Sequence, residues 1–192
     1  MCKEQPIHEE EYKGHTIKIF LDDMAESPRE WDNLGTMVCF HGRYNLGDKH
    51  DFDSPYDLEQ FLKHSGAIHL PLYLYDHSGI TMNTTGFHCP WDSGQVGVIY
   101  ITKNTIRKEM SRKKGKKYIP IKHVSKHDKA RALALLRSEV KTYDDYITGN
   151  VTGFVIEKDD EHVDSCWGFL GDYDGEYGSL TEAKSIVDAE VA

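Results

Sequence analysis

Three stretches of the chain concentrate the side chains that could perform chemistry. They are residues 25–33 (AESPREWDN), 40–53 (FHGRYNLGDKHDFD) and 76–92 (DHSGITMNTTGFHCPWD). Together they contain these imidazole, thiol and carboxylate groups: His41, His50, His77, His88, Cys89, Asp48, Asp51, Asp53, Asp76, Asp92, Glu26, Glu30 and Asp32. Because imidazole and carboxylate are the usual protein ligands of zinc, manganese and iron, a divalent metal ion is a candidate cofactor.

The ligands that such a metal site would use are His41, His50, Asp76 and His77. Their spacing does not single out a metal site, since the H-E-x-x-H motif is absent. Asp76 and His77 are adjacent, so on a β-strand they would point to opposite faces of the sheet. The alternative is that these groups cap turns and form hydrogen bonds with the loop backbone.

The same stretches contain side chains suited to binding a partner. The candidates are Arg29, Trp31, Asp32, Arg43, Tyr44 and Trp91. Trp, Tyr and Arg are the residue types that most often supply the binding energy of an interface. Because functional residues gather on loops held by a rigid scaffold, we expect the three stretches to meet on one side of a sheet and to form the functional face.

A different chemistry would use Cys39 and His41, which would lie on the same side of a strand. A thiol and an imidazole in this arrangement can form an activated nucleophile. Cys39 lies in the apolar run of residues 37–40, however, and a buried cysteine usually behaves as a small hydrophobic residue. The four cysteines show no C-x-x-C spacing, so we expect reduced thiols.

Charge is distributed unevenly along the chain. The net charge is −9 at pH 7, yet residues 103–131 contain twelve lysines and arginines against two acidic residues. The twelve are Lys103, Arg107, Lys108, Arg112, Lys113, Lys114, Lys116, Lys117, Lys122, Lys126, Lys129 and Arg131. This basic segment predicts contact with a nucleic acid or an acidic partner, with Lys113, Lys114, Lys116 and Lys117 as binding candidates. The alternative is a solvated strip that offsets the charge of an acidic body.

Short strands must position these groups. Runs of apolar and β-branched residues, several of them alternating with polar ones, predict strands. The predicted strands are residues 15–21, 36–41, 70–75, 96–102, 153–157 and 163–169. Residues 22–35 are expected to form an irregular loop.

Helices are predicted by their end signals. One begins with Ser54 as the cap and Pro55 at the first helical position, and Gly66 ends it. A short basic helix contains Ile106 and Met110. The longest helix starts at Ser125, where Asp128 completes a capping box, and stops before residues 149–150. A last helix is expected to be capped by the S-x-x-E sequence at residues 179–182.

These elements predict an α+β fold in a single domain spanning residues 1–192. The sheet is expected to be small, either mixed or antiparallel, with helices packed on it, because strands come partly in hairpins and are not separated regularly by crossover helices. Within the basic segment, residues 112–117 around Gly115 form the candidate hinge. The absence of G-x-G-x-x-G and G-x-x-x-x-G-K-[ST] argues against a nucleotide-binding Rossmann or P-loop enzyme.

The composition excludes a membrane span. No run approaches the roughly 20 apolar residues that a span needs. The first eleven residues contain four glutamates and no apolar segment typical of a secretory signal. We therefore expect a cytoplasmic protein that makes no membrane contact.

Three segments resemble a family of uncharacterised proteins carried by bacteriophages, prophages and plasmids. They are AESPREWDNLGTMVCFHGRYNLGD (residues 25–48), LPLYLYDHSGITMNTTGFHCPWDSGQVG (residues 70–97) and DSCWGFLGD (residues 164–172). The resemblance implies a mobile-element accessory protein that acts in the host-cell cytoplasm. Small phage proteins of this kind often inhibit a host defence system, of the restriction or CRISPR type. The family supplies no catalytic residue or cofactor to transfer.

The sequence is compatible with two classes of function. In the first, the protein binds a host protein or nucleoprotein, with the aromatic residues of the loops as anchors. In the second, the loops form a cleft in which His and Asp side chains hold a metal ion and hydrolyse a phosphodiester or nucleotide. The sequence leaves open whether the protein is an enzyme.

Overall fold

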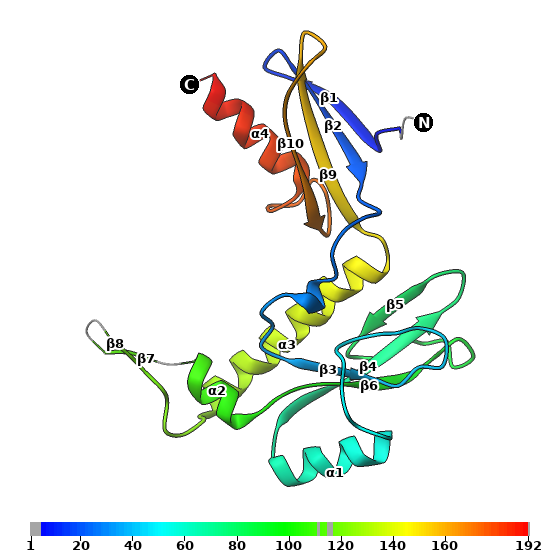
Figure 1. Cartoon of the computed structure of the whole chain (residues 1–192), viewed down its shortest axis with the longest axis vertical. Helices are drawn as coiled ribbons and strands as arrows, with labels where there is room; N and C mark the ends of the chain where they lie inside the picture. The colour runs from blue at the N-terminus through cyan, green and yellow to red at the C-terminus, as the bar shows by residue number, and fades with distance from the viewer. Residues whose placement is uncertain (1–4, 111, 115–116, 192) are drawn as a thin grey trace. The chain divides into compact units, whose positions relative to one another are not determined.

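A computed structural model describes residues 5–110, 112–114 and 117–191. Over these residues the fold is α+β, as predicted, with four α-helices, two four-stranded antiparallel sheets and a two-stranded hairpin (Figure 1). The chain divides into two compact units, unit 1 from residues 1–28 and 145–192 and unit 2 from residues 29–144. That residues 1–192 behave as one domain stays a prediction.

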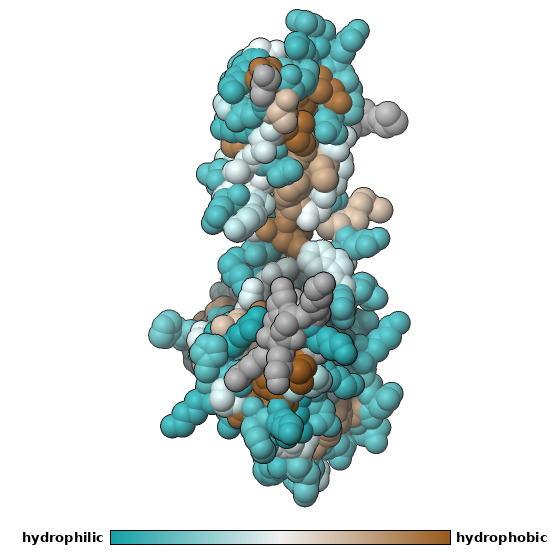
Figure 2. Space-filling view, turned by 90° about the vertical axis from the view of Figure 1, so that its left-hand side faces the viewer, coloured by the Kyte–Doolittle hydropathy of each residue, from teal (hydrophilic) through white to brown (hydrophobic). Residues whose placement is uncertain are grey.

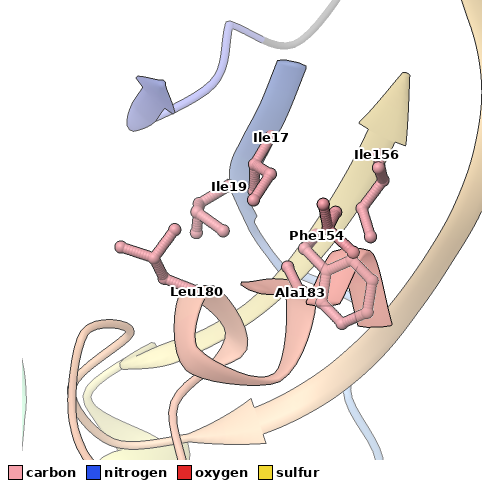
Figure 3. Packing of buried hydrophobic residues seen from close by; sticks show 7 residues of the cluster. Ile17, Ile19, Phe154, Ile156, Leu180 and Ala183 are labelled. Carbon is pink, nitrogen blue, oxygen red and sulfur yellow. The ribbon is translucent and has the colours of Figure 1, made fainter. Parts of the chain in front are cut away.

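Unit 1 contains a sheet with a helix on one face. The strand order is β1 (His8–Tyr12), β2 (His15–Leu21), β9 (Val151–Lys158) and β10 (Glu161–Leu170), and α4 (Ser179–Glu190) packs against it. Alternation along the strands places every second side chain on the face toward α4. The buried cluster on that face consists of Ile17, Ile19, Phe154, Ile156, Leu180, Ala183 and Val187 (Figure 3).

The hairpin between β9 and β10 turns at residues that adopt positive φ. Asp159 has φ 52° and Asp160 has φ 65°. A two-residue loop with both residues in the left-handed region is the turn whose twist matches that of antiparallel strands, and aspartate tolerates this region better than most residues. The strands on either side of this turn are longer than the predicted residues 153–157 and 163–169.

The predicted cap of the last helix is wrong. Gly178 is the N-cap residue of α4, and it makes no side-chain capping hydrogen bond. Ser179 lies one position inside the helix, where its hydroxyl oxygen is 2.9 Å from that of Thr152 in β9. Both side chains are buried, so each hydroxyl needs a partner, and the two hydroxyls provide that partner for each other.

Unit 2 contains a sheet with the strand order β3 (Thr36–Cys39), β6 (Ser93–Ile101), β4 (Ile68–Asp76) and β5 (Ile80–Asn83). Two helices cover it, α1 (Pro55–Ser65) and α3 (Lys126–Ile147), which lie on opposite sides of the sheet in Figure 1. The buried cluster under α1 consists of Val38, Leu58, Leu62, Ala67 and Val98.

Both helices begin as the sequence predicts. The Ser54 hydroxyl accepts a hydrogen bond from the Asp57 N–H, and Gly66 ends α1 with φ 57°. At the start of α3 the Ser125 and Asp128 side chains each accept a hydrogen bond from the other residue's backbone N–H. These bonds satisfy N–H groups that have no partner inside a helix.

Some elements were not predicted. β1 contains three consecutive glutamates, and β5 lies inside the stretch of residues 76–92 that was expected to be a loop. η1 (Pro28–Glu30) is a short 3-10 helix in the predicted irregular loop. The stretch predicted as a hinge, residues 112–117, contains β7 (Arg112–Lys114) and the first residue of β8 (Lys117–Ile119), while residues 115–116 lie outside the described residues. The two strands pair as a hairpin after α2 (Lys103–Glu109).

One face of the protein is predominantly polar. On the face drawn in Figure 2, hydrophilic residues cover most of the area and hydrophobic residues gather in smaller patches. Among the described residues no helix is both long enough and apolar enough to cross a membrane.

Candidate functional site

Arg29 connects the first two loops to helix α3. Its guanidinium donates two hydrogen bonds to the Asp48 carboxylate, at 2.7 and 2.8 Å, one to Glu139 at 3.1 Å and one to the Gly35 carbonyl at 2.7 Å. Burial lowers the pKa of Arg29, but the bonds and charges of Asp48 and Glu139 outweigh this effect and raise it above its ordinary value. The guanidinium therefore stays charged inside the protein.

This position favours a structural role for Arg29 over the predicted contact with a partner. Only 4% of its side chain is exposed, so the guanidinium does not lie at the surface where a partner could contact it. The two carboxylates it binds also accept backbone N–H groups: Asp48 from Met37, and Glu139 from Leu34 and Gly35. Arg29 thus fixes the chain on both sides of strand β3.

Arg43 and Tyr44 join the second and third loops. The Arg43 guanidinium forms an ion pair with Asp76, and the Tyr44 hydroxyl donates a hydrogen bond to the same carboxylate at 3.3 Å. The Tyr44 ring stacks on His41, with ring centroids 5.1 Å apart and planes inclined by 15°. The Arg43 side chain remains 70% exposed, so it is accessible from solvent.

Asp92 forms contacts with several other residues of the third loop. The Asp92 carboxylate lies 3.3 Å from Nδ1 of His77 and accepts a hydrogen bond from the Cys89 thiol at 3.5 Å, while its carbonyl accepts one from the Asp76 N–H at 2.8 Å. Next to Asp92, the Trp91 side chain is 92% exposed. The third loop is thus held by internal hydrogen bonds, and it exposes the Trp91 indole to solvent.

We call residues 29–33, 41–45, 76–79 and 88–92 the loop surface. Arg29 links the first of these segments to Asp48, just beyond the second, and Arg43 links the second to the third. Besides Trp91 and Arg43, the exposed candidates on it are Trp31, which is 52% exposed, and Asp32. Except for Arg29, the loop residues expected to bind a partner thus stay accessible or half-buried in the structure.

The metal-ligand candidates have other contacts. Nε2 of His50 is 3.2 Å from the Cys39 carbonyl oxygen, and its ring lies near those of Phe40 and Phe52. Asp76 binds Arg43, and His77 lies beside Asp92. The described part of the chain brings no three His, Cys, Asp or Glu side chains together in an arrangement that could hold a metal ion.

Cys39 is a core residue. Its side chain is buried, and burial together with the charge of Asp48 raises the pKa of the thiol to about 12. A nucleophilic cysteine needs the thiolate, which requires a lowered pKa and access to solvent. The arrangement favours the interpretation of Cys39 as a small hydrophobic residue over a Cys39–His41 nucleophile.

The basic segment lies in unit 2 and spans α2, the β7–β8 hairpin and the start of α3. Lys113 and Lys114 belong to β7 and Lys117 to β8, where the Lys117 side chain is exposed, while Lys116 lies outside the described residues. Other exposed cations of the segment are Lys103, Lys108, Lys122, Lys126, Lys129 and Arg131.

Glu139 was missed as a site residue. It lies in α3 between Leu136 and Val140, both fully or almost fully buried, so the helical spacing places it at the margin of the apolar face. An acidic residue at that margin is a signal that a buried cation or backbone N–H faces it. Its partner Arg29 lies 110 residues away in sequence, which no local pattern reveals.

Comparison with known proteins gave no relative: no family model, no curated protein and no solved structure matches the chain.

Proposed function

We propose that this protein is a mobile-element accessory protein that acts by binding a host protein or nucleoprotein through the loop surface. The observation that carries the proposal is the exposure of Trp91, which is 92% in solvent although its loop is internally bonded. Tryptophan is the residue type most enriched among binding hot spots, and an indole gains most from leaving water.

The bonds beneath the loops support the same function. Arg29, Arg43 and Asp92 join loop side chains to one another through hydrogen bonds and ion pairs with charged groups, which are stronger than neutral hydrogen bonds. A surface ordered before the partner arrives loses little conformational entropy when it binds. Trp31 and Tyr44 provide further aromatic area, and Arg43 provides a charge that can steer the encounter.

The resemblance to proteins of phages and plasmids supports the choice of partner. It favours a component of a host defence system, such as a restriction or CRISPR complex, encountered in the host-cell cytoplasm. Such complexes contain nucleic acid, and the exposed lysines of residues 103–131 would offer it a second contact. The proposed mode of action is inhibition by occupation of the partner's surface.

Replacing Trp91 tests this function directly. Proteins from a bacterial lysate are captured on the immobilised protein and on its Trp91→Ala variant, and the affinity for each captured protein is then measured. We expect affinity to fall by roughly 30-fold, equivalent to about 2 kcal/mol, for a central hot spot. The melting temperature should not change, because the side chain has almost no contacts to lose.

Tyr177→Ala is the matched control. Tyr177 is 85% exposed and lies outside the loop surface, so its removal deletes a similar area of exposed aromatic side chain. Equal capture by the wild-type protein and the Trp91→Ala variant would contradict a partner site at the loops. A defence-sensitive phage plated on cells that express each protein provides the second measurement. Protection lost with Trp91→Ala and kept with Tyr177→Ala is the expected result.

A further inference from the structure

The sheet of unit 1 has one covered and one open face. Helix α4 covers the face that carries Ile17 and Phe154. On the opposite face lies a shallow hollow of about 630 Å³, whose lining includes Glu9, Lys18, Phe20, Val155, Glu157 and Trp167. None of these residues belongs to the loop surface, so a ligand site in the hollow is independent of the proposed function of the loops.

The strand geometry presents the Trp167 indole on this open face. In the pairing of β10 with β9, Cys166 pairs with Phe154 and Phe169 with Thr152, so that Trp167 and Gly168 together oppose Gly153. A bulge of this kind changes the direction in which a side chain points. The indole occupies the space that a side chain at position 153 would fill, so only glycine is compatible with it there.

The indole is supported and yet accessible. Its ring centroid lies 6.1 Å from that of Phe20 in β2, and 45% of the residue remains exposed. Strand β2 also carries Lys18, whose ammonium is 2.5 Å from the Glu157 carboxylate. An aromatic face that stays open to solvent, with charged groups around it, is suited to a ligand that combines a flat or apolar part with a charge.

The charges around the hollow are unequal. Among the described residues that line it there are two carboxylates, Glu9 and Glu157, and one ammonium, Lys18, which is bound to Glu157. Glu9 lies opposite Lys18 in the pairing of β1 with β2, and its charge acts on the Lys18 ammonium; within the described residues its carboxylate forms no ion pair, so it can still accept hydrogen bonds from a ligand. The resulting negative excess repels phosphate groups and attracts cations.

We infer that this hollow binds an arginine side chain on a basic segment of a partner protein. The guanidinium stacks on the Trp167 indole and donates hydrogen bonds to Glu9, and the aliphatic part of the side chain lies on Phe20 and Val155. Arginine fits better than lysine, because its planar and weakly hydrated cation can stack on an indole and bind a carboxylate at the same time. A nucleic acid is disfavoured by the carboxylates.

The test uses a synthetic peptide of alternating arginine and glycine on the full-length protein. Binding is followed by the indole N–H signals in a nitrogen-15 NMR spectrum, in which Trp167→Phe identifies the signal of Trp167. We expect the peptide to shift this signal and to leave that of Trp91 unchanged. A peptide of alternating lysine and glycine should bind several-fold more weakly, and one of alternating glutamate and glycine should not bind.

Three substitutions in the hollow and one control outside it separate the proposed contacts from general attraction to an acidic protein. Glu9→Gln should weaken binding of the arginine peptide about three- to tenfold, whereas Glu176→Gln, an equal loss of charge at an exposed residue that does not line the hollow, should leave it unchanged. Lys18→Gln should strengthen binding, because Glu157 is then released to the ligand. Trp167→Leu should weaken it roughly two- to 30-fold, the range of a cation–π contact.

The inference is overturned if the arginine peptide leaves the Trp167 signal in place, or if Glu9→Gln and Glu176→Gln have equal effects. It is equally overturned if a neutral oligosaccharide or a single-stranded oligonucleotide shifts the signal and the peptide does not. Glu9→Gln and Lys18→Gln alter exposed or half-exposed charges and leave the core of the sheet intact, so they decide the question even if Trp167→Leu unfolds.

Discussion

At the residue scale, Arg29 has the sequence context of a binding residue, but in the structure its side chain stabilises the fold. An arginine in a polar loop beside a tryptophan is typical of an interface anchor. Here the fork of its guanidinium is filled by Asp48, which lies 19 residues away, and by Glu139 in a helix much later in the chain. The sequence supplies the residue type, while the partners that decide its role come from tertiary structure.

Replacing Arg29 should cost much of the stability of unit 2. In Arg29→Ala the Asp48 and Glu139 carboxylates, whose side chains are 22% and 16% exposed, lose the cation that compensates their burial. Removing one partner of a buried ion pair typically costs about 3–5 kcal/mol, and the partial exposure of both carboxylates places the expectation near the lower end. Urea unfolding measures the change.

Lys63→Ala is the control for this prediction. Lys63 forms an ion pair with Glu59 one helical turn away, and both side chains are 59% exposed. Pairs of this kind contribute about 0.3–0.5 kcal/mol. If Arg29→Ala were no more destabilising than Lys63→Ala, the structural role assigned to Arg29 would be wrong.

At the scale of elements, helix ends were predictable when the capping groups were local, and only then. Ser54 and Ser125 cap the helices that follow them. In each case the serine hydroxyl accepts a hydrogen bond from the N–H only three residues later in the sequence. Ser179 is likewise followed three residues later by an acidic residue, in the pattern S-x-x-E, but its hydroxyl faces that of Thr152 in strand β9. A contact across 27 residues of sequence thus outweighed a local rule.

Strands, like helix ends, were predictable where the signal was local and were missed where it depended on a distant partner. Residues 15–21 were predicted to the residue because apolar side chains alternate along them and one face of the sheet is buried. β1 was missed because its central residues are Glu9, Glu10 and Glu11, which have low strand propensity, and it exists by pairing with β2. The loop surface was predictable as a gathering of residue types, but not the bonds from Asp76 and Asp92 that order it.

The cap of α1 gives a quantitative test at this scale. Ser54→Ala removes the acceptor for the Asp57 N–H and should lower the free energy of unfolding by about 1 kcal/mol. Ser54→Gly should cost only a few tenths of a kcal/mol, because glycine is itself a favourable N-cap residue. Both values come from urea unfolding followed by circular dichroism. Equal losses in the two variants would show that the hydroxyl does not cap the helix.

At the scale of the whole molecule, the distribution of charge matters more than its sum. A chain with a net charge of −9 repels nucleic acid overall, yet its basic segment is concentrated in 29 consecutive positions, residues 103–131. Salt screens distant charges within about 10 Å at 0.1 M, so a phosphate backbone at the segment experiences mainly the nearby lysines. Local attraction can therefore exceed the repulsion by the rest of the protein.

If the segment contacts nucleic acid, binding should weaken steeply as salt is raised, because each neutralised phosphate releases counterions. Changing Lys113, Lys114, Lys116 and Lys117 to Glu should abolish binding to duplex DNA and keep the fold. Fluorescence anisotropy between 50 and 200 mM salt measures both effects, over roughly the range in which phosphate contacts change affinity most visibly.

Charge reversal elsewhere provides the comparison. Lys49 and Lys63 are exposed lysines of the same unit outside the segment, so Lys49→Glu with Lys63→Glu changes the net charge as much as reversing Lys113 and Lys114. Binding that is independent of salt, or that both double variants weaken equally, would leave the segment as surface charge without a partner.

Unit 1 is built from two segments that are far apart in the sequence, so its two parts are synthesised at different times during translation. Its sheet joins β2 to β9, and Lys18 and Glu157, which pair across these strands, are 139 residues apart. At about 5–20 residues per second, the ribosome needs roughly 7–28 s to synthesise that interval. Residues 29–144 form a continuous unit and can fold first. Until β9 has been synthesised, Ile17 and Ile19 lack the residues of that strand against which they pack. The nascent chain, more than the finished protein, is therefore the form in which this sequence is open to aggregation and to chaperones.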